Sequence, residues 1–272
     1  MKPDRDAPIG VFDSGVGGLT VAREIMRNLP SEKIVYFGDT ARVPYGGKSR
    51  ENIIRYSRQI IHFLMEQQVK AIVIACNTAS AFALEAVRDE FDVPILGVIE
   101  PGARVAAAET KNKRVGVIGT VGTVDSGIHA SYLKKLDPEI TVISKACPLF
   151  VPLVEEGWLH DPVTAEVTAR YLQEFKDKDV DTLILGCTHY PLLVDIIAEI
   201  LGPKVTLVSA GEESAYELKR LLKSGGLWAG PAGQGGTEFY VSDRPEDFER
   251  IASVFLQEDL RHTARRIDID QY

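Results

Sequence analysis

Two cysteines stand at matching points of two similar segments in this chain of 272 residues. Cys76 follows the apolar run Ala71–Ala75 and precedes Asn-Thr, and Cys187 follows the run Thr182–Leu185 and one glycine and precedes Thr. A thiol at the start of a helix meets free backbone N–H groups and a partial positive charge, which favour the thiolate. A lone Cys in an apolar run is usually only a small buried side chain. Two at matched positions favour a chemical role, in which thiols accept and donate protons.

A titratable side chain is expected beside each thiol. His189 lies two residues after Cys187, where an imidazole could raise the thiolate population or receive the thiol proton. Asp13 ends the first apolar run, and it should lie near Cys76 because the carboxyl ends of parallel strands meet at one edge of a sheet. Each has a simpler interpretation, His189 as a solvent-bonded residue at a helix start and Asp13 as a helix cap. Cys147 is expected to be structural, since no Thr and helix start follow it.

Two thiols that face one pocket could invert a stereocentre. A thiolate removes a proton from one face of a carbon, a thiol returns a proton to the opposite face, and the roles exchange in the reverse direction. Because a free thiol is only a few per cent ionised at neutral pH, each needs the help that Asp13 and His189 would supply. Asn77, Thr78 and Thr188 would bind a carboxylate and stabilise a carbanion-like transition state. This chemistry demands neither a cofactor nor a metal.

Short apolar runs rich in β-branched residues alternate with amphipathic segments along the chain. Continuous apolar runs predict strands buried on both faces, as in parallel sheets covered by helices. The expected strands are Ile9–Phe12, Ile34–Phe37, Ala71–Ala75, Ile95–Ile99, Val115–Ile118, Ile140–Ile143, Thr182–Leu185, Val205–Val208 and Phe239–Val241. The expected helices include Arg50–Gln67, Val163–Phe175, Leu192–Leu201 and Pro245–Leu256. The fold class is therefore α/β.

A weak internal repeat indicates two similar halves. The strand and small-residue turn at Ile9–Gly15 resembles that at Val115–Thr120, and the segment that ends in Cys76 resembles the one that ends in Cys187. We expect two similar α/β domains with mostly parallel sheets and the active site in the cleft between them. The first comprises residues 1–99 plus 208–272, and the second comprises residues 100–207.

Composition excludes several classes of protein. Thirty-one Lys and Arg against 39 Asp and Glu give a net charge of −8, so no nucleic acid is expected as a partner. The most apolar uncharged stretch, Ala71–Leu84, is too short to span a membrane. The N-terminus shows no hydrophobic segment of a secretory signal, which favours a cytoplasmic protein with reduced cysteines. The five scattered histidines show no zinc-binding spacing, so no metal site is expected.

Other catalytic motifs fail on inspection. Gly15–Thr20 begins like a dinucleotide fingerprint, but Thr20 replaces its third glycine. The chain has neither a phosphate-binding G-x-x-x-x-G-K-[ST] loop nor the G-x-S-x-G turn of α/β-hydrolases. These absences leave the two thiols as the most informative feature of the sequence.

At these residues the sequence resembles the cofactor-independent aspartate/glutamate racemase family. The resemblance extends over at least Ile9–Leu256, and its markers stand in the same order: Asp13–Gly18, Gly38–Thr40, Pro44–Gly46, Cys76–Thr78, Glu155–Gly157 and Gly186–Pro191. It implies two α/β domains with the substrate between them and Cys76 and Cys187 as the two bases. It also implies the interconversion of L- and D-glutamate for peptidoglycan synthesis, without a cofactor, by a homodimer.

The resemblance also implies a role for individual residues. Cys76 would take the α-proton of D-glutamate and Cys187 that of L-glutamate, assisted by Asp13 and His189, with Glu155 near His189. The expected substrate-lining residues are Asp13, Ser14, Tyr45, Gly46, Asn77, Thr78, Thr188 and His189, together with Glu155, Thr120 and Thr123.

Three alternatives stay open at the level of sequence. Aspartate could replace glutamate as the substrate, because pocket depth is a property of the folded protein and the choice of glutamate rests on the resemblance. A cysteine-nucleophile amidase or isomerase would use Cys187 with His189 and form a covalent adduct with its substrate. A protein that only binds a small acid would need no thiols, since Ser or Gly would serve at both positions.

Overall fold

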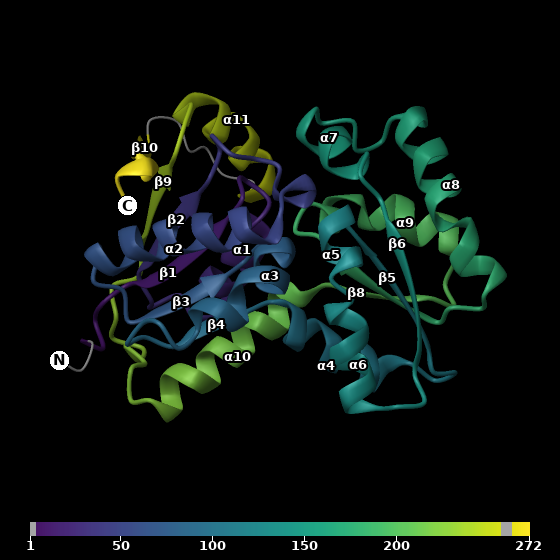
Figure 1. Ribbon diagram of the computed structural model, residues 1–272, viewed down its shortest axis with the longest axis horizontal. Coiled ribbons are helices and arrows are strands. Elements are labelled where there is room, and N and C mark those ends of the chain that lie inside the picture. The colour runs from purple at the N-terminus through teal and green to yellow at the C-terminus, as the bar shows by residue number, and fades with distance from the viewer. Residues whose placement is uncertain (1–3, 257–262) are drawn as a thin grey trace. The chain divides into compact units, whose positions relative to one another are not determined.

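The computed structural model describes residues 4–256 and 263–272 (Figure 1). The chain forms two compact units, Met1–Val98 with Gly211–Tyr272 and Ile99–Ala210. Each unit is built around its own sheet, in which every paired strand runs parallel to its neighbour. None of the helices among the described residues is long and apolar enough to cross a bilayer.

The first unit contains a six-stranded sheet of order β10-β9-β2-β1-β3-β4. Its strands are β1 (Ile9–Asp13), β2 (Ile34–Gly38), β3 (Ala71–Ile74), β4 (Ile95–Gly97), β9 (Thr237–Val241) and β10 (Ala264–Arg266). Its helices are α1 (Leu19–Asn28), α2 (Arg50–Glu66), α3 (Asn77–Val87) and α11 (Pro245–Leu256), with the 3₁₀ turns η1 (Tyr45–Gly47) and η3 (Ile269–Gln271). Helix α10 (Ala210–Ser224) starts at the boundary of the units.

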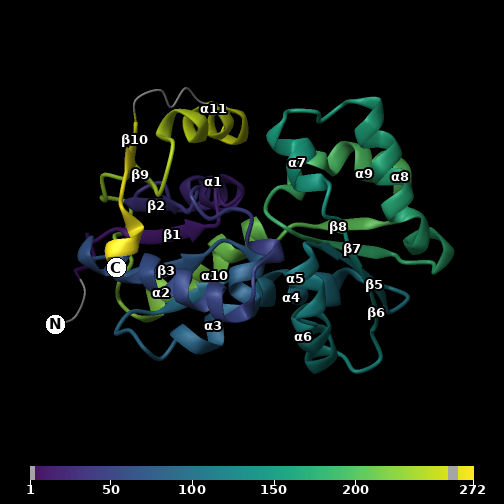
Figure 2. The ribbon, with the colours of Figure 1, turned by 45° about the horizontal axis from the view of Figure 1, so that its top comes forward.

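Helices cover both faces of this sheet, which explains why its central strands are continuous apolar runs. Successive residues of a strand point to opposite faces. The ring of Phe37 packs against Phe63 of α2 at a centroid distance of 5.2 Å, whereas the ring of its neighbour Tyr36 packs against Phe248 of α11 at 6.0 Å. Helices α2 and α3 pack together on the first face, and α1 and α11 pack together on the other (Figure 2).

The second unit contains a four-stranded sheet of order β6-β5-β7-β8. Its strands are β5 (Arg114–Gly119), β6 (Thr141–Ala146), β7 (Thr182–Gly186) and β8 (Thr206–Val208). Its helices are α4 (Ile99–Glu109), α5 (Val121–Asp125), α6 (Ile128–Leu136), α7 (Phe150–Glu155), α8 (Pro162–Asp177) and α9 (Val194–Leu201), with the 3₁₀ turn η2 (Tyr190–Leu193). Residues of α4 and α6 form a buried core with β5 and β7.

The two sheets share one strand order, as the repeat hypothesis requires. In the first unit the order β2-β1-β3-β4 matches β6-β5-β7-β8 in the second, with β9 and β10 added beyond β2. In open α/β sheets, ligands bind beyond the carboxyl ends of the strands, where the strand order reverses. That point lies between β1 and β3 in one unit and between β5 and β7 in the other, and a cysteine follows β3 and β7.

The α/β class with parallel sheets is confirmed, and all nine predicted strands are present with shifts of a few residues at their ends. Strand β10 was not predicted, because Ala264–Arg266 is short and highly charged. The segment predicted as a helix over Leu192–Leu201 begins instead with the 3₁₀ turn η2, which has a proline at its start, and becomes α-helical at Val194.

Candidate active site

Cys76 occupies the N-cap position of α3, and one residue separates it from the end of β3. Its Sγ atom accepts a hydrogen bond from the backbone N–H of Ala79 at 3.5 Å. The thiol donates to Ser14 Oγ at 3.8 Å, and Ser14 belongs to the turn that follows β1. A sulfur held by backbone N–H groups at a helix start is stabilised as the thiolate. The side chains of Asn77 and Thr78 are buried in the first turn of the same helix.

Asp13 ends β1 and binds the turn that leads into α1. Its Oδ2 atom accepts hydrogen bonds from the backbone N–H groups of Gly15 at 3.2 Å and Gly18 at 3.0 Å, so Asp13 holds the turn before α1, whose N-cap residue is Gly18. Burial raises the pKa of Tyr36, and the charges of Asp13 and Cys76 raise it further. Asp13 and Cys76 thus both act on the buried side chain of Tyr36, whose hydroxyl donates to Gly15 O at 2.8 Å.

Tyr45 is held by a buried carboxylate that the sequence analysis left without a role. Its hydroxyl donates to Asp39, the first residue after β2. Asp39 also accepts hydrogen bonds from Arg42 Nε at 2.7 Å and from Ser242 Oγ at 2.9 Å. Burial raises the pKa of Tyr45, and the charge of Asp39 adds to the effect. Asp39 was visible in the sequence only as part of the marker Gly38–Thr40, because no pattern showed that Arg42, Tyr45 and the distant Ser242 share this carboxylate.

Cys187 directly follows β7, and a hydrogen-bonded chain of side chains extends from it. Its Sγ atom lies 3.8 Å from His189 Nδ1, and His189 Nε2 lies 3.0 Å from Oε1 of Glu155, the last residue of α7. Burial lowers the pKa of His189, but the hydrogen bonds and charges of Cys187 and Glu155 outweigh burial and raise it to about 10. The imidazole is therefore protonated at neutral pH, and it can stabilise a Cys187 thiolate.

Three threonines lie at the same edge of the second sheet. Thr120 follows β5 and caps α5, where its Oγ1 accepts from the N–H of Thr123 at 3.3 Å. The hydroxyls of Thr120 and Thr123 lie 3.0 Å apart. Thr188, which lies between Cys187 and His189 in the sequence, is buried. Several small polar groups are thus available beside Cys187 to bind a polar ligand.

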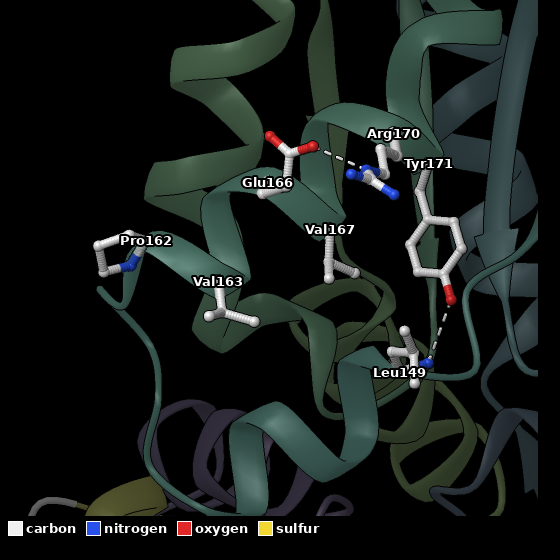
Figure 3. Close-up of a pocket in the computed structure, with 7 residues that line it drawn as sticks. All are labelled: Leu149, Pro162, Val163, Glu166, Val167, Arg170 and Tyr171. Carbon is white, nitrogen blue, oxygen red and sulfur yellow. Dashed lines mark hydrogen bonds and ion pairs between the residues drawn. The ribbon is translucent and has the colours of Figure 1, made fainter.

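The third thiol has a different environment. Cys147 is buried after β6, and burial raises its pKa to about 12, so it stays protonated at neutral pH. A groove of about 380 Å³ beside α8 has a mainly apolar lining that includes Leu149, Val163 and Tyr171 (Figure 3). It contains no residue that the sequence analysis placed in the active site.

The residues expected at the site fall into two sets, one in each unit, at the carboxyl ends of the strands. The first unit contributes Asp13, Ser14, Tyr45, Gly46, Cys76, Asn77 and Thr78. The second unit contributes Thr120, Thr123, Glu155, Cys187, Thr188 and His189. Each set thus pairs one thiol with at least one titratable group, and the two thiols differ in that Cys187 has an imidazolium and Cys76 a helix start.

Comparison with known proteins agrees with this arrangement. Residues 9–215 match the family model described as Asp/Glu/hydantoin racemase. A glutamate racemase of Geobacter metallireducens is 53% identical over 249 residues, which cover 91% of this chain and 92% of the relative. The crystal structure of a glutamate racemase isoform from Bacillus anthracis superposes with a TM-score of 0.92 at 41% identity and covers 98% of both chains. The glutamate racemase of Francisella tularensis, solved in complex with D-glutamate, has a TM-score of 0.92 at 40% identity and covers 98% of this chain and all of its own.

Proposed function

The chain belongs to the Asp/Glu/hydantoin racemase family, and we propose that it interconverts L- and D-glutamate with two thiols and no cofactor. The observation that carries the proposal is the matched placement of Cys76 and Cys187, each after the corresponding strand of two sheets with one strand order. Glutamate as the substrate is supported by relatives of 40% identity or more that are named glutamate racemases, one of them bound to D-glutamate.

From L-glutamate, the reaction begins at the Cys187 thiolate. The sulfur takes the α-proton, and the electron pair of the broken C–H bond stays on Cα, delocalised into the α-carboxylate. The Cys76 thiol then protonates the opposite face of Cα and is left as the thiolate. The reverse reaction starts from that thiolate, which the backbone N–H of Ala79 at the start of α3 stabilises. The His189 imidazolium stabilises the Cys187 thiolate in the same way.

Polar groups at both edges would hold the substrate. Asn77, Thr78 and Thr188 suit a carboxylate, because amide and hydroxyl donors stabilise the charge that develops on it as Cα loses its proton. Asp13 is suited to an ammonium group, and its charge acts in the same region as Cys76. The family resemblance supports a cytoplasmic homodimer, and sedimentation equilibrium tests its oligomeric state. It also supports a role of the product D-glutamate in peptidoglycan synthesis.

The two-thiol mechanism is tested by proton exchange. Purified protein is incubated with L-glutamate in D₂O without added cofactor. The two enantiomers are separated by chiral chromatography, and their deuterium content is measured by mass spectrometry. We expect D-glutamate with one deuterium at Cα, because the second thiol exchanges with D₂O and delivers a deuteron. Cys76→Ala and Cys187→Ala should each lower the rate by at least about a hundredfold, the contribution typical of one acid or base. Near-wild-type racemisation by either variant would refute the assignment.

The same preparations separate the alternatives. If L-aspartate is racemised and L-glutamate is not, the protein is an aspartate racemase. A covalent adduct on Cys187 with retained activity in Cys76→Ala would indicate a nucleophilic enzyme. Binding of glutamate without any exchange in D₂O would indicate a binding protein.

A further inference from the structure

Tyr190, the residue after His189, joins two segments of the second unit. Its side chain is fully buried, and its hydroxyl donates a hydrogen bond to the backbone carbonyl of Cys147 at 3.0 Å. Its ring meets the ring of Phe150 edge-on, at a centroid distance of 5.1 Å and an interplanar angle of 89°. Tyr190 therefore fixes the β6–α7 connection and the first residue of α7 to the turn that carries Cys187 and His189.

Helix α7 is attached to that turn at both of its ends. It begins at Phe150, which contacts Tyr190, and it ends at Glu155, whose carboxylate binds His189. Since α7 has only six residues, a displacement of its first residue shifts its last by a comparable amount. The contact between Glu155 and His189 thus depends on the contact between Phe150 and Tyr190.

The ring of Phe150 also contacts a second tyrosine. It meets the ring of Tyr171 of α8 edge-on at 5.3 Å and 85°. The hydroxyl of Tyr171 accepts the backbone N–H of Leu149 at 3.4 Å, as the dashed line in Figure 3 shows. Phe150 is therefore held between two tyrosines, and of these Tyr190 adjoins the catalytic turn.

From this arrangement we infer that Tyr190 is a positioning residue, which holds the Glu155 carboxylate on His189 and thereby stabilises the Cys187 thiolate. Burial raises the pKa of Tyr190, so its hydroxyl remains a donor over the working range of pH. Only the racemisation readout of this inference rests on the proposed function, since the reactivity of the Cys187 thiol can be measured without turnover.

Tyr190→Phe removes the hydroxyl and keeps the ring. Thiolates react with iodoacetamide and thiols do not, so the rate at which Cys187 is alkylated at pH 7, followed by mass spectrometry of its peptide, reports the thiolate population. We expect this rate to fall about 2- to 3-fold, the lower end of the range of one buried neutral hydrogen bond, because His189 stays mostly protonated at pH 7. Tyr240→Phe is the matched control, because it removes a phenol hydroxyl that donates to Glu238 in the first unit, and it should leave the rate unchanged.

A double variant separates positioning from general destabilisation. If Tyr190 acts through Glu155, Tyr190→Phe should slow alkylation in the wild-type background and add little in a Glu155→Gln background. In racemisation by Tyr190→Phe, the primary isotope effect measured with α-deuterated L-glutamate should rise, because only proton removal by Cys187 is slowed. The isotope effect measured with α-deuterated D-glutamate should not rise. Phe150→Leu, which removes the ring contact and keeps apolar volume, should act in the same direction and covers the case in which Tyr190→Phe fails to fold.

A folded Tyr190→Phe protein with the wild-type rate of Cys187 alkylation would overturn the inference, as would full additivity with Glu155→Gln. If the wild-type protein failed to racemise glutamate while Tyr190→Phe still slowed alkylation, the proposed function would fall and the positioning role would stand.

Discussion

Glu155→Gln tests whether the charge of Glu155 maintains the His189 imidazolium. Glutamine keeps the shape of the side chain and an oxygen that can accept from Nε2, so the change removes the charge and not the contact. His189 is 4% exposed and Glu155 is 30% exposed, and their atoms lie 3.0 Å apart. Because Glu155 helps to raise the pKa of His189 to about 10, the substitution should lower that pKa.

The size of the effect follows from the geometry. A hydrogen bond to a charged group contributes about 1.5–3 kcal/mol, and water reaches Glu155, so the lower part of this range applies. At 1.36 kcal/mol per pH unit, the pKa of His189 should fall by about one to two. His189 then stays protonated at pH 7 and is mostly neutral at about pH 9.5, where the wild-type residue is still largely protonated.

The assay is kcat/KM for racemisation between pH 7 and 10, measured by circular dichroism, which follows the enantiomers without a coupling enzyme. The ratio of variant to wild type removes the titration of the substrate's amino group, which is common to both. We expect this ratio to lie within about threefold of unity at pH 7 and to fall about tenfold further by pH 9.5, in line with the loss of the imidazolium.

Glu156→Gln is the control, because Glu156 is exposed and its substitution changes the net charge equally. Its ratio should stay constant with pH. A Glu155→Gln ratio that is constant, or that rises with pH, would show that the charge of Glu155 does not maintain the His189 proton. A ¹⁵N NMR titration of His189 measures the same pKa without turnover.

Three further outcomes are expected. Because the pKa of His189 is raised from 6.5 to about 10, its contribution to stability is complete below pH 6.5 and is lost as pH rises toward 10. In urea unfolding, the stability gap between wild type and Glu155→Gln should stay constant up to about pH 8 and close between there and pH 10, where only the wild-type residue is still losing its contribution. A gap that stays constant to pH 10 would contradict this. Asp13→Asn should raise the primary isotope effect with α-deuterated D-glutamate and lower that with L-glutamate, since only the Cys76 step is slowed; equal changes would remove the pairing of Asp13 with Cys76. Gly38→Ala should cost about 1–3 kcal/mol in urea unfolding and lower activity, because the new Cβ would lie 2.7 Å from Gly15 O, whereas Gly47→Ala meets nothing within 4 Å and should be neutral.

The sequence predicted those features that depend on local pattern. Continuous apolar runs located the nine strands, and the residues that follow them located both thiols at the carboxyl ends of β3 and β7. This works because a parallel sheet requires its strands to be buried on both faces and presents its loops at one edge. His189 could be associated with Cys187 for the same reason, as the two lie in a single turn.

Contacts between distant segments could not be read from the sequence. Asp39 joins Tyr45, Arg42 and Ser242, and the last is more than 200 residues away in the chain. The 3.0 Å contact of Glu155 with His189 depends on how α7 packs, and only the resemblance pointed to it. Strand β10 forms because β9 offers a free edge, although its own residues have little strand character.

The unequal surroundings of the two thiols bear on how each cycle begins. In the proposed mechanism one thiolate and one thiol must be present at the start, since two thiolates could not protonate Cα and two thiols could not deprotonate it. In the proposed mechanism the imidazolium of His189 acts at Cys187, whereas Asp13 and the backbone N–H of Ala79 act at Cys76. This difference between the two thiols leaves the equilibrium unchanged, because enantiomers have equal free energies in water and kcat/KM must be the same from either side. What the arrangement controls is which proton transfer limits the rate, and that is why substitutions on the two sides should be distinguished by isotope effects and not by efficiency.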